Sequence, residues 1–175
     1  MPQPNPWTLE ILDASPNVAE FTPVLDAYYA LQIPRLKAIG GPDVDPQEVI
    51  ADFWAHIDEC MPPTGCFVLA RDDTGIVGCG ALHPLGDGAA ELKRLYVEPR
   101  ARGTGLGRAL VQERIAVARQ LGYTRLYCDT LKNSVEMQGL YKTLGFELCG
   151  PYPGDGTLAV FPELADKILF YTRSI

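Results

Sequence analysis

The sequence lacks the cysteine and apolar patterns that mark several classes of protein. None of its cysteines forms a CxxC pair, and their number, five, is odd, which argues against both a zinc site and a disulfide framework. No apolar run approaches the roughly 20 residues needed to span a bilayer, and the start, MPQPNPW, has neither the basic segment nor the apolar core of a secretory signal. The sequence therefore predicts a cytoplasmic protein without a membrane partner or a metal, whose thiols are small buried hydrophobic groups.

Positive charge is also scarce, with 15 Lys and Arg against 22 Asp and Glu and a net charge of −7. A polyanion requires a basic face, so we do not expect nucleic acid as a partner. Eight of the fifteen basic residues lie between Lys93 and Arg125, where Glu98 and Glu113 are the only acids. This segment carries +6 and the remainder −13, so the segment favours an anion while the remaining surface attracts cations.

The length of 175 residues predicts one domain, residues 1–175, built around one core. Apolar alternation predicts strands over residues 7–13, 66–71, 76–83, 90–97, 125–130, 146–149 and 167–172. Helical periodicity predicts helices over residues 18–32, 46–60, 106–121 and 134–144. Pro34 is expected to end the first helix, and a long loop is expected from Gly150. This order predicts an α/β (α+β) fold with a mixed, mostly antiparallel central sheet of about six to seven strands and helices on both faces.

The stretch from Glu91 to Leu110 concentrates the candidate chemistry. A predicted strand ends there, and Gly103, Gly105 and Gly107 alternate at the start of a predicted helix. Glycines let a ligand approach the backbone, and free N–H groups at a helix start bind anions. Arginines on the same loop add charge-assisted donors for phosphate oxygens. The pattern predicts a phosphate-binding loop; the alternative is a tight strand-to-helix connection, for which one glycine would suffice.

Two motifs resemble the GNAT (GCN5-related) N-acetyltransferases. RARGTG at residues 100–105 matches that family's arginine-x-x-glycine-x-glycine pattern, and LYKTLGF at residues 140–146 resembles its LYxxxGF helix end. The motifs lie at the family's usual separation, and the order of elements agrees over nearly the whole chain. The resemblance implies the GNAT fold and an enzyme that moves acetyl from acetyl-CoA to a primary amine of a small molecule or peptide, by direct attack in a ternary complex.

The resemblance also implies a set of residues that bind acetyl-CoA. Backbone groups near residues 95–97 would pair with the pantetheine arm as an added strand does, and the glycine loop would hold the pyrophosphate. For Arg100 a surface charge is the alternative. Many relatives carry asparagine where this chain has Ser134, and the neighbouring Asn133 is either a cofactor contact or a helix cap. The implied set is Leu95, Tyr96, Val97, Arg100, Arg102, Gly103, Thr104, Gly105, Leu106, Gly107, Arg108, Asn133 and Ser134.

For catalysis the resemblance implies Tyr141 as the acid that protonates the departing CoA thiolate. The alternative for Tyr141 is aromatic packing beneath the cofactor loop. Glu91 is the candidate general base, and its alternatives are a salt bridge to a nearby Lys or Arg or action through a water molecule. A backbone N–H near Leu95 would stabilise the tetrahedral intermediate. Residues expected to be structural or peripheral are Cys79, Cys128, His56, His83 and Asp129.

The acceptor is the part that the sequence defines least. We expect residues 18–60 and the loop from Gly150 to Leu164 to shape its site, and the acidic remainder suggests a cationic small amine or a peptide N-terminus. Two other classes stay open: a non-catalytic acyl-CoA-binding module and a partner-binding domain on the same scaffold. The last strand is expected at a sheet edge that a second copy could pair with, so the sequence leaves a homodimer open.

Overall fold

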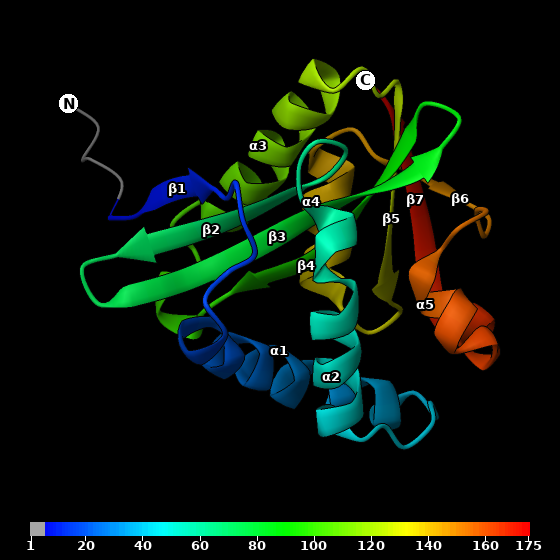
Figure 1. Cartoon of the computed structure of the whole chain (residues 1–175). Coiled ribbons are helices and arrows are strands. Elements are labelled where there is room, and N and C mark those ends of the chain that lie inside the picture. Colours follow the sequence, from blue (N-terminus) through cyan, green and yellow to red (C-terminus); the bar gives the residue numbers. More distant parts are fainter. Residues whose placement is uncertain (1–5) are drawn as a thin grey trace.

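The computed structural model describes residues 6–175, so residues 1–5 of the expected domain lie outside the described part. Seven strands form one sheet in the order β1-β2-β3-β4-β5-β7-β6 (Figure 1). The strands are β1 (Thr8–Ile11), β2 (Cys66–Asp72), β3 (Gly75–Gly86), β4 (Ala89–Val97), β5 (Arg125–Leu131), β6 (Glu147–Cys149) and β7 (Ile168–Ser174). Among the strand pairs of residues 6–175, only β4–β5 is parallel, which confirms the mixed, mostly antiparallel sheet.

Helices cover both faces of this sheet, as expected (Figure 1). The α-helices are α1 (Val18–Ala38), α2 (Pro46–His56), α3 (Leu106–Gln120), α4 (Val135–Thr143) and α5 (Gly156–Val160). Short 3-10 turns are η1 (Ile57–Cys60), η2 (Pro99–Ala101) and η3 (Pro162–Asp166). In the part that the structure describes, no helix is long and apolar enough to cross a membrane.

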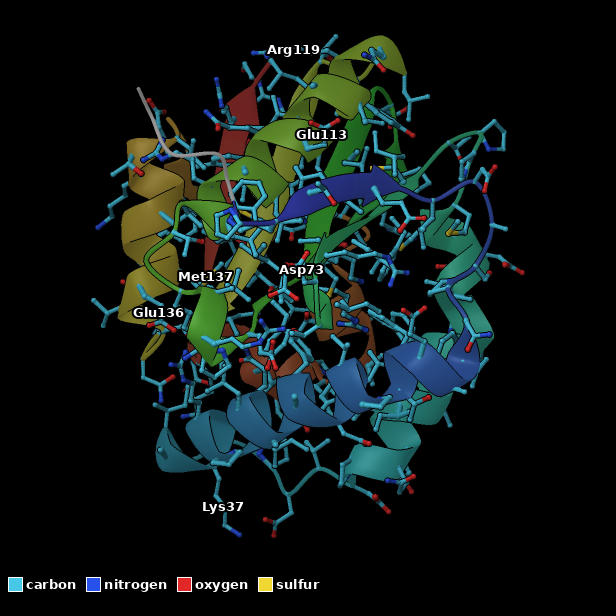
Figure 2. All side chains as sticks on the ribbon, turned by 90° about the vertical axis from the view of Figure 1, so that its left-hand side faces the viewer. Lys37, Asp73, Glu113, Arg119, Glu136 and Met137 are labelled. Carbon is cyan, nitrogen blue, oxygen red and sulfur yellow. The ribbon has the colours of Figure 1, made fainter. Side chains whose placement is uncertain are left out.

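Strand β2 shows how the two faces are filled. Its alternate residues Val68 and Ala70 pack in the core beneath α3 and α4, whereas Phe67 and Leu69 pack in the core beneath α1 and α2. The turned view shows α1, which ends near Lys37, and α3, which carries Glu113 and Arg119, at opposite sides of the molecule (Figure 2). The sheet is therefore covered on both sides, and access to its centre has to come between its strands.

Helix α1 continues beyond Pro34, so the expected helix end at that residue is wrong. The helix runs to Ala38 with Pro34 inside it. Tertiary contacts outweigh the hydrogen bond that proline removes: Leu36 is buried in the last turn, and the carbonyl of Arg35 accepts a hydrogen bond of 2.9 Å from Asn133 Nδ2. The end of α1 is thereby fixed against the segment that precedes α4.

The C-terminal part departs from the expectation in two places. Strand β7 lies between β5 and β6, so it is not the open edge that was expected to pair with a second copy; the sheet edges are β1 and β6. The long loop from Gly150 also contains α5 and η3. The Asp155 side chain caps α5 by accepting from the N–H of Leu158 at 2.9 Å. Proline and glycine in this segment conceal a helix of only five residues from a periodicity search.

Candidate functional site

The sheet opens between β4 and β5. The two strands pair over only three residues, with Ala89, Ala90 and Glu91 opposite residues 125–127, and then diverge (Figure 1). Beyond Glu91, residues 92–97 of β4 have no β5 partner on that side. An unpaired strand edge offers backbone donors and acceptors to any extended ligand. The expected backbone contacts at Leu95, Tyr96 and Val97 fall in this open stretch.

A β-bulge interrupts the β3–β4 ladder along the same stretch. The register shifts between Cys79 and Ala81, so Gly80 of β3 stands opposite two residues of β4, Arg94 and Leu95. Arg94 has a φ of 56°, a left-handed conformation that costs an L-residue about 1–2 kcal/mol. Strained residues of this kind cluster at binding and catalytic sites.

Arg114 of α3 supports the bulge from the other face of the sheet. Its Nη1 donates to the carbonyl oxygens of Ala81 and Lys93, at 3.0 and 3.1 Å, and the side chain is fully buried. Gly80 makes room for it, since a Cβ atom there would lie 2.6 Å from Arg114 Cζ. Arg114 therefore satisfies carbonyls on both strands beside the bulge, a role that the sequence pattern did not indicate.

The glycine loop follows directly after β4. Gly103 and Gly105 have φ angles of 78° and 85°, and a Cβ atom at either would face open space. Gly105 is the N-cap of α3. Within residues 6–175, the backbone N–H groups from Gly103 to Gly107 have no backbone acceptor, and they lie at the positive end of the helix dipole. The loop thus has the unpaired donors and free space that an anion requires.

The polar side chains of this loop contact other groups of the protein. Arg100 forms ion pairs with Asp72 and with Glu98, which favours its interpretation as a surface charge. Arg102 Nε donates to the Val97 carbonyl at 3.1 Å and leaves an exposed guanidinium beside the glycines. Two other side chains fix the loop with three hydrogen bonds: Thr104 contacts Trp7 and Ala101, and Arg108 contacts Thr143.

The segment before α4 does not support the alternative that Asn133 caps this helix. Ser134 is the N-cap residue of α4 and makes no capping hydrogen bond, and it accepts from Arg35 Nη1 at 3.2 Å. Asn133 donates to the Arg35 carbonyl, so it is not the cap, and its Oδ1 is buried without a partner in the described chain. Both residues connect α1 to α4.

A cavity of about 790 Å³ lies on the α1–α2 side of the opening. Residues from α1, α2 and η1 line one wall, and residues from the 154–164 segment line another. These are the two segments expected to shape an acceptor site. Its inner wall includes Glu91, Lys93, Arg94, Asp129 and Tyr141, so both candidate catalytic residues border one space.

Glu91 is the most enclosed acid of the cavity wall, with 1% of its surface exposed. Its Oε1 accepts from the Tyr152 hydroxyl at 3.0 Å, and its Oε2 lies 3.5 Å from Lys93 Nζ. Burial raises the pKa of the Glu91 carboxyl, and Lys93 partly offsets that rise. His83 contacts Glu59 at 3.0 Å and lies 3.9 Å from Glu91, so it borders the cavity and is less peripheral than expected.

Two further acids join Glu91, and the sequence interpretation missed both. Asp129 and Asp155 each place one carboxylate oxygen within 4.8 Å of a Glu91 oxygen and of each other. Burial, with Asp155 and Glu91 nearby, raises the pKa of Asp129 to about 7. Three carboxylates so close attract a cation, and Lys93 is the cation already beside them. Asp129, expected as a plain strand-end residue, is therefore part of the cavity chemistry.

Tyr141 lies on α4 with 3% of its surface exposed. Its ring packs against Phe146 and Tyr171, at centroid distances of 5.5 and 5.6 Å, so the packing alternative describes part of its environment. Burial raises the pKa of its phenol well above the ordinary value, and the neighbouring Cys128 adds to that rise. The hydroxyl therefore remains protonated at neutral pH. Cys79 and Cys128 are buried, as expected of core thiols.

An open strand edge that leads to an anion-binding loop at a helix start, next to a cavity with acids on its wall, defines a class of protein. Proteins of this class bind an extended anionic ligand along the opened sheet and a second molecule in the adjacent cavity. The chain matches the Acetyltransferase (GNAT) family over residues 28–146. It belongs to that family.

Known proteins with similar sequences and folds agree with this assignment. An uncharacterized N-acetyltransferase of Schizosaccharomyces pombe is 45% identical over 114 residues, 64% of this chain and 70% of that protein. An IAA acetyltransferase of Azospirillum brasilense is 33% identical over 153 residues, 85% and 97% of the two chains. An acetyltransferase from Streptococcus agalactiae has the same fold, with a TM-score of 0.72 at 21% identity, covering 95% and 98% of the two chains. A GNAT family acetyltransferase from Elizabethkingia anophelis, solved with acetyl-CoA bound, has a TM-score of 0.62 at 19% identity, covering 99% and 100%.

Proposed function

We propose that residues 1–175 act as one N-acetyltransferase domain, which transfers acetyl from acetyl-CoA to a primary amine by direct attack in a ternary complex. The observation that carries the proposal is the meeting of two spaces at Glu91. The open edge of β4 and the glycine loop lie on one side of this residue, and the acid-lined cavity lies on the other. The edge and loop suit acetyl-CoA, and the cavity suits the amine.

The residues present fit acetyl-CoA. The unpaired N–H groups from Gly103 to Gly107, and the space above Gly103 and Gly105, suit a pyrophosphate. The free edge over residues 92–97 suits the amides of an extended arm. When bound, acetyl-CoA supplies the acetyl group as a thioester. Of the arginines, Arg102 and Arg108 reach this loop, while Arg100 is held by Asp72 and Glu98.

Glu91 is the group we propose to remove the proton from the incoming ammonium. Its pKa is raised by burial, which makes its carboxylate a better proton acceptor than an exposed one. Asp129 lies in the same cluster and shares that property. The amine nitrogen would then form the new C–N bond at the thioester carbonyl, and the C–S bond would break afterwards, while Lys93 limits the charge that accumulates among the acids.

Tyr141 is the group we propose to protonate the departing sulfur. It borders the cavity and carries its proton at neutral pH because burial raises its pKa. Transfer of that proton to the thiolate would keep CoA from attacking the new amide. The backbone N–H near Leu95, turned by the bulge, is our candidate donor to the carbonyl oxygen. The cytoplasmic location and the absence of membrane, nucleic acid and metal partners stay predictions.

The test is a free-thiol release assay with acetyl-CoA against a panel of polyamines, amino acids, aminoglycosides and short peptides. Thiol release that depends on an amine, with the acetylated amine identified by mass spectrometry, supports the proposal. Stabilisation by acetyl-CoA without turnover on any amine would favour a binding module. No stabilisation at all would favour a partner-binding domain.

A further inference from the structure

Arg94 is a second cation, besides Lys93, on the wall of the acid-lined cavity. Its side chain lines the cavity beside Tyr28 and Tyr29 of α1. Burial raises the pKa of Tyr28 to about 12, and the charge of Arg94 is the main opposing influence. Within residues 6–175, the partly buried Arg94 guanidinium has no hydrogen bond and no acid within ion-pair distance, and Glu91 acts on it only from farther away. Arg94 is thus a cation without a direct ion-pair partner in a space of the right size for a small molecule.

The backbone at Arg94 indicates that this placement is built into the fold. The residue lies at the bulge with a φ of 56°, and Arg114 holds the carbonyl oxygen of the preceding residue from beneath at 3.1 Å. A regular strand would turn successive side chains to alternate faces of the sheet. The bulge changes that alternation, and the side chain of Arg94 lines the same cavity as Glu91.

The acid cluster and Arg94 together are complementary to a small molecule that carries both an ammonium group and a carboxylate. Glu91, Asp129 and Asp155 form a cluster that attracts an ammonium group, and each has a buried oxygen without a hydrogen-bond partner among the described residues. A guanidinium offers planar, paired donors that match the two oxygens of a carboxylate. An amine without a carboxylate would leave the partly buried Arg94 guanidinium without a direct partner, whereas a carboxylate would supply one.

We propose that the acceptor carries a carboxylate as well as its amine, as an amino acid does, and that Arg94 binds this carboxylate. The inference rests on the proposed function and narrows the cationic acceptor expected from net charge to a zwitterion. The acids on the cavity rim, Asp43, Asp45, Glu48 and Asp52, attract the amine end, while Arg94 selects the acid end.

The test compares amino acids with their carboxamides, which lack the carboxylate charge that Arg94 would bind. We expect wild-type kcat/KM to favour each amino acid over its carboxamide by about 10- to 100-fold, the range of a hydrogen bond to a charged group. R94N should remove this preference mainly through KM, and R94K should restore part of it. Asparagine tolerates the left-handed backbone, so R94N should fold. The control is R125N, an exposed arginine at the far end of β5.

A binding measurement separates failure of this inference from failure of the proposed function. CoA-loaded protein is titrated calorimetrically with N-acetyl amino acids and with their carboxamides. Binding of the acids to wild type and R125N, and its loss in R94N, supports the carboxylate site even if no amine is turned over. Equal affinity for acids and carboxamides, equal affinity of wild type and R94N, or no binding of either ligand would overturn the inference.

Discussion

The buried contact between Gly80 and Arg114 leads to a quantitative prediction about stability. A Cβ atom at Gly80 would lie 2.6 Å from Cζ of Arg114, well inside the usual contact distance of about 3.5–4.0 Å. In G80A the guanidinium must withdraw by about 1 Å, which breaks its hydrogen bonds to Ala81 and Lys93. Each buried carbonyl left unpaired costs about 1–3 kcal/mol. We therefore expect G80A to lower the free energy of unfolding by about 2–5 kcal/mol.

A double-mutant cycle tests the cause. R114A loses the same two hydrogen bonds and leaves a cavity, so it should cost about 3–5 kcal/mol. In the double variant the new methyl group at position 80 enters the space that the guanidinium vacates. The double variant should then be about as stable as R114A, so the coupling energy should equal the cost of G80A, about 2–5 kcal/mol. Urea unfolding followed by circular dichroism measures all four proteins. Additive effects within about 0.5 kcal/mol, or wild-type stability of G80A, would refute the reasoning.

Three further predictions concern the site. G105V should abolish acetyl-CoA binding in calorimetry, because its side chain enters the anion loop and Gly105 has a φ of 85°; G150V, at an open glycine, should bind normally. Y141F should lower turnover and keep acetyl-CoA affinity, and equal turnover would remove Tyr141 from the mechanism. The raised pKa of Asp129, about 7 against about 3.9 unfolded, means that the folded state holds the proton more tightly, so stability should fall as pH rises from about 4 to 7. D129N should flatten that fall in thermal unfolding, and parallel curves for the two proteins would contradict it.

The sequence was sufficient for features that a local pattern encodes. Gly103 and Gly105 predicted a phosphate-binding loop, because a positive φ and a close approach to a ligand both favour glycine. The apolar alternation of β2 to β4 indicated the meander for the same local reason. Helix α1 shows the limit of such patterns, since contacts made by Leu36 and Asn133 keep it helical past Pro34.

The acid cluster could not be predicted because it depends on strand register. Glu91 pairs with Tyr127 in the parallel β4–β5 segment, and Asp129 lies two residues further along the same face of β5. Asp155 reaches them from a loop whose proline and glycine content hid α5. Nothing in the local sequence indicates which residues of distant segments share a register. The bulge at Arg94 has the same origin, because it exists only relative to β3.

The short β4–β5 junction also has a consequence for solubility. Exposed strand edges invite pairing with other chains, and proteins usually protect them with charge, proline or irregular backbone. Here the unpaired edge of residues 92–97 lies in the middle of the sheet, with helices over both faces. Helices on both faces leave little room for the flat approach that pairing with another folded chain requires. The fold thus shields an unpaired strand edge from aggregation and leaves it free for the acetyl-CoA that we propose as its ligand.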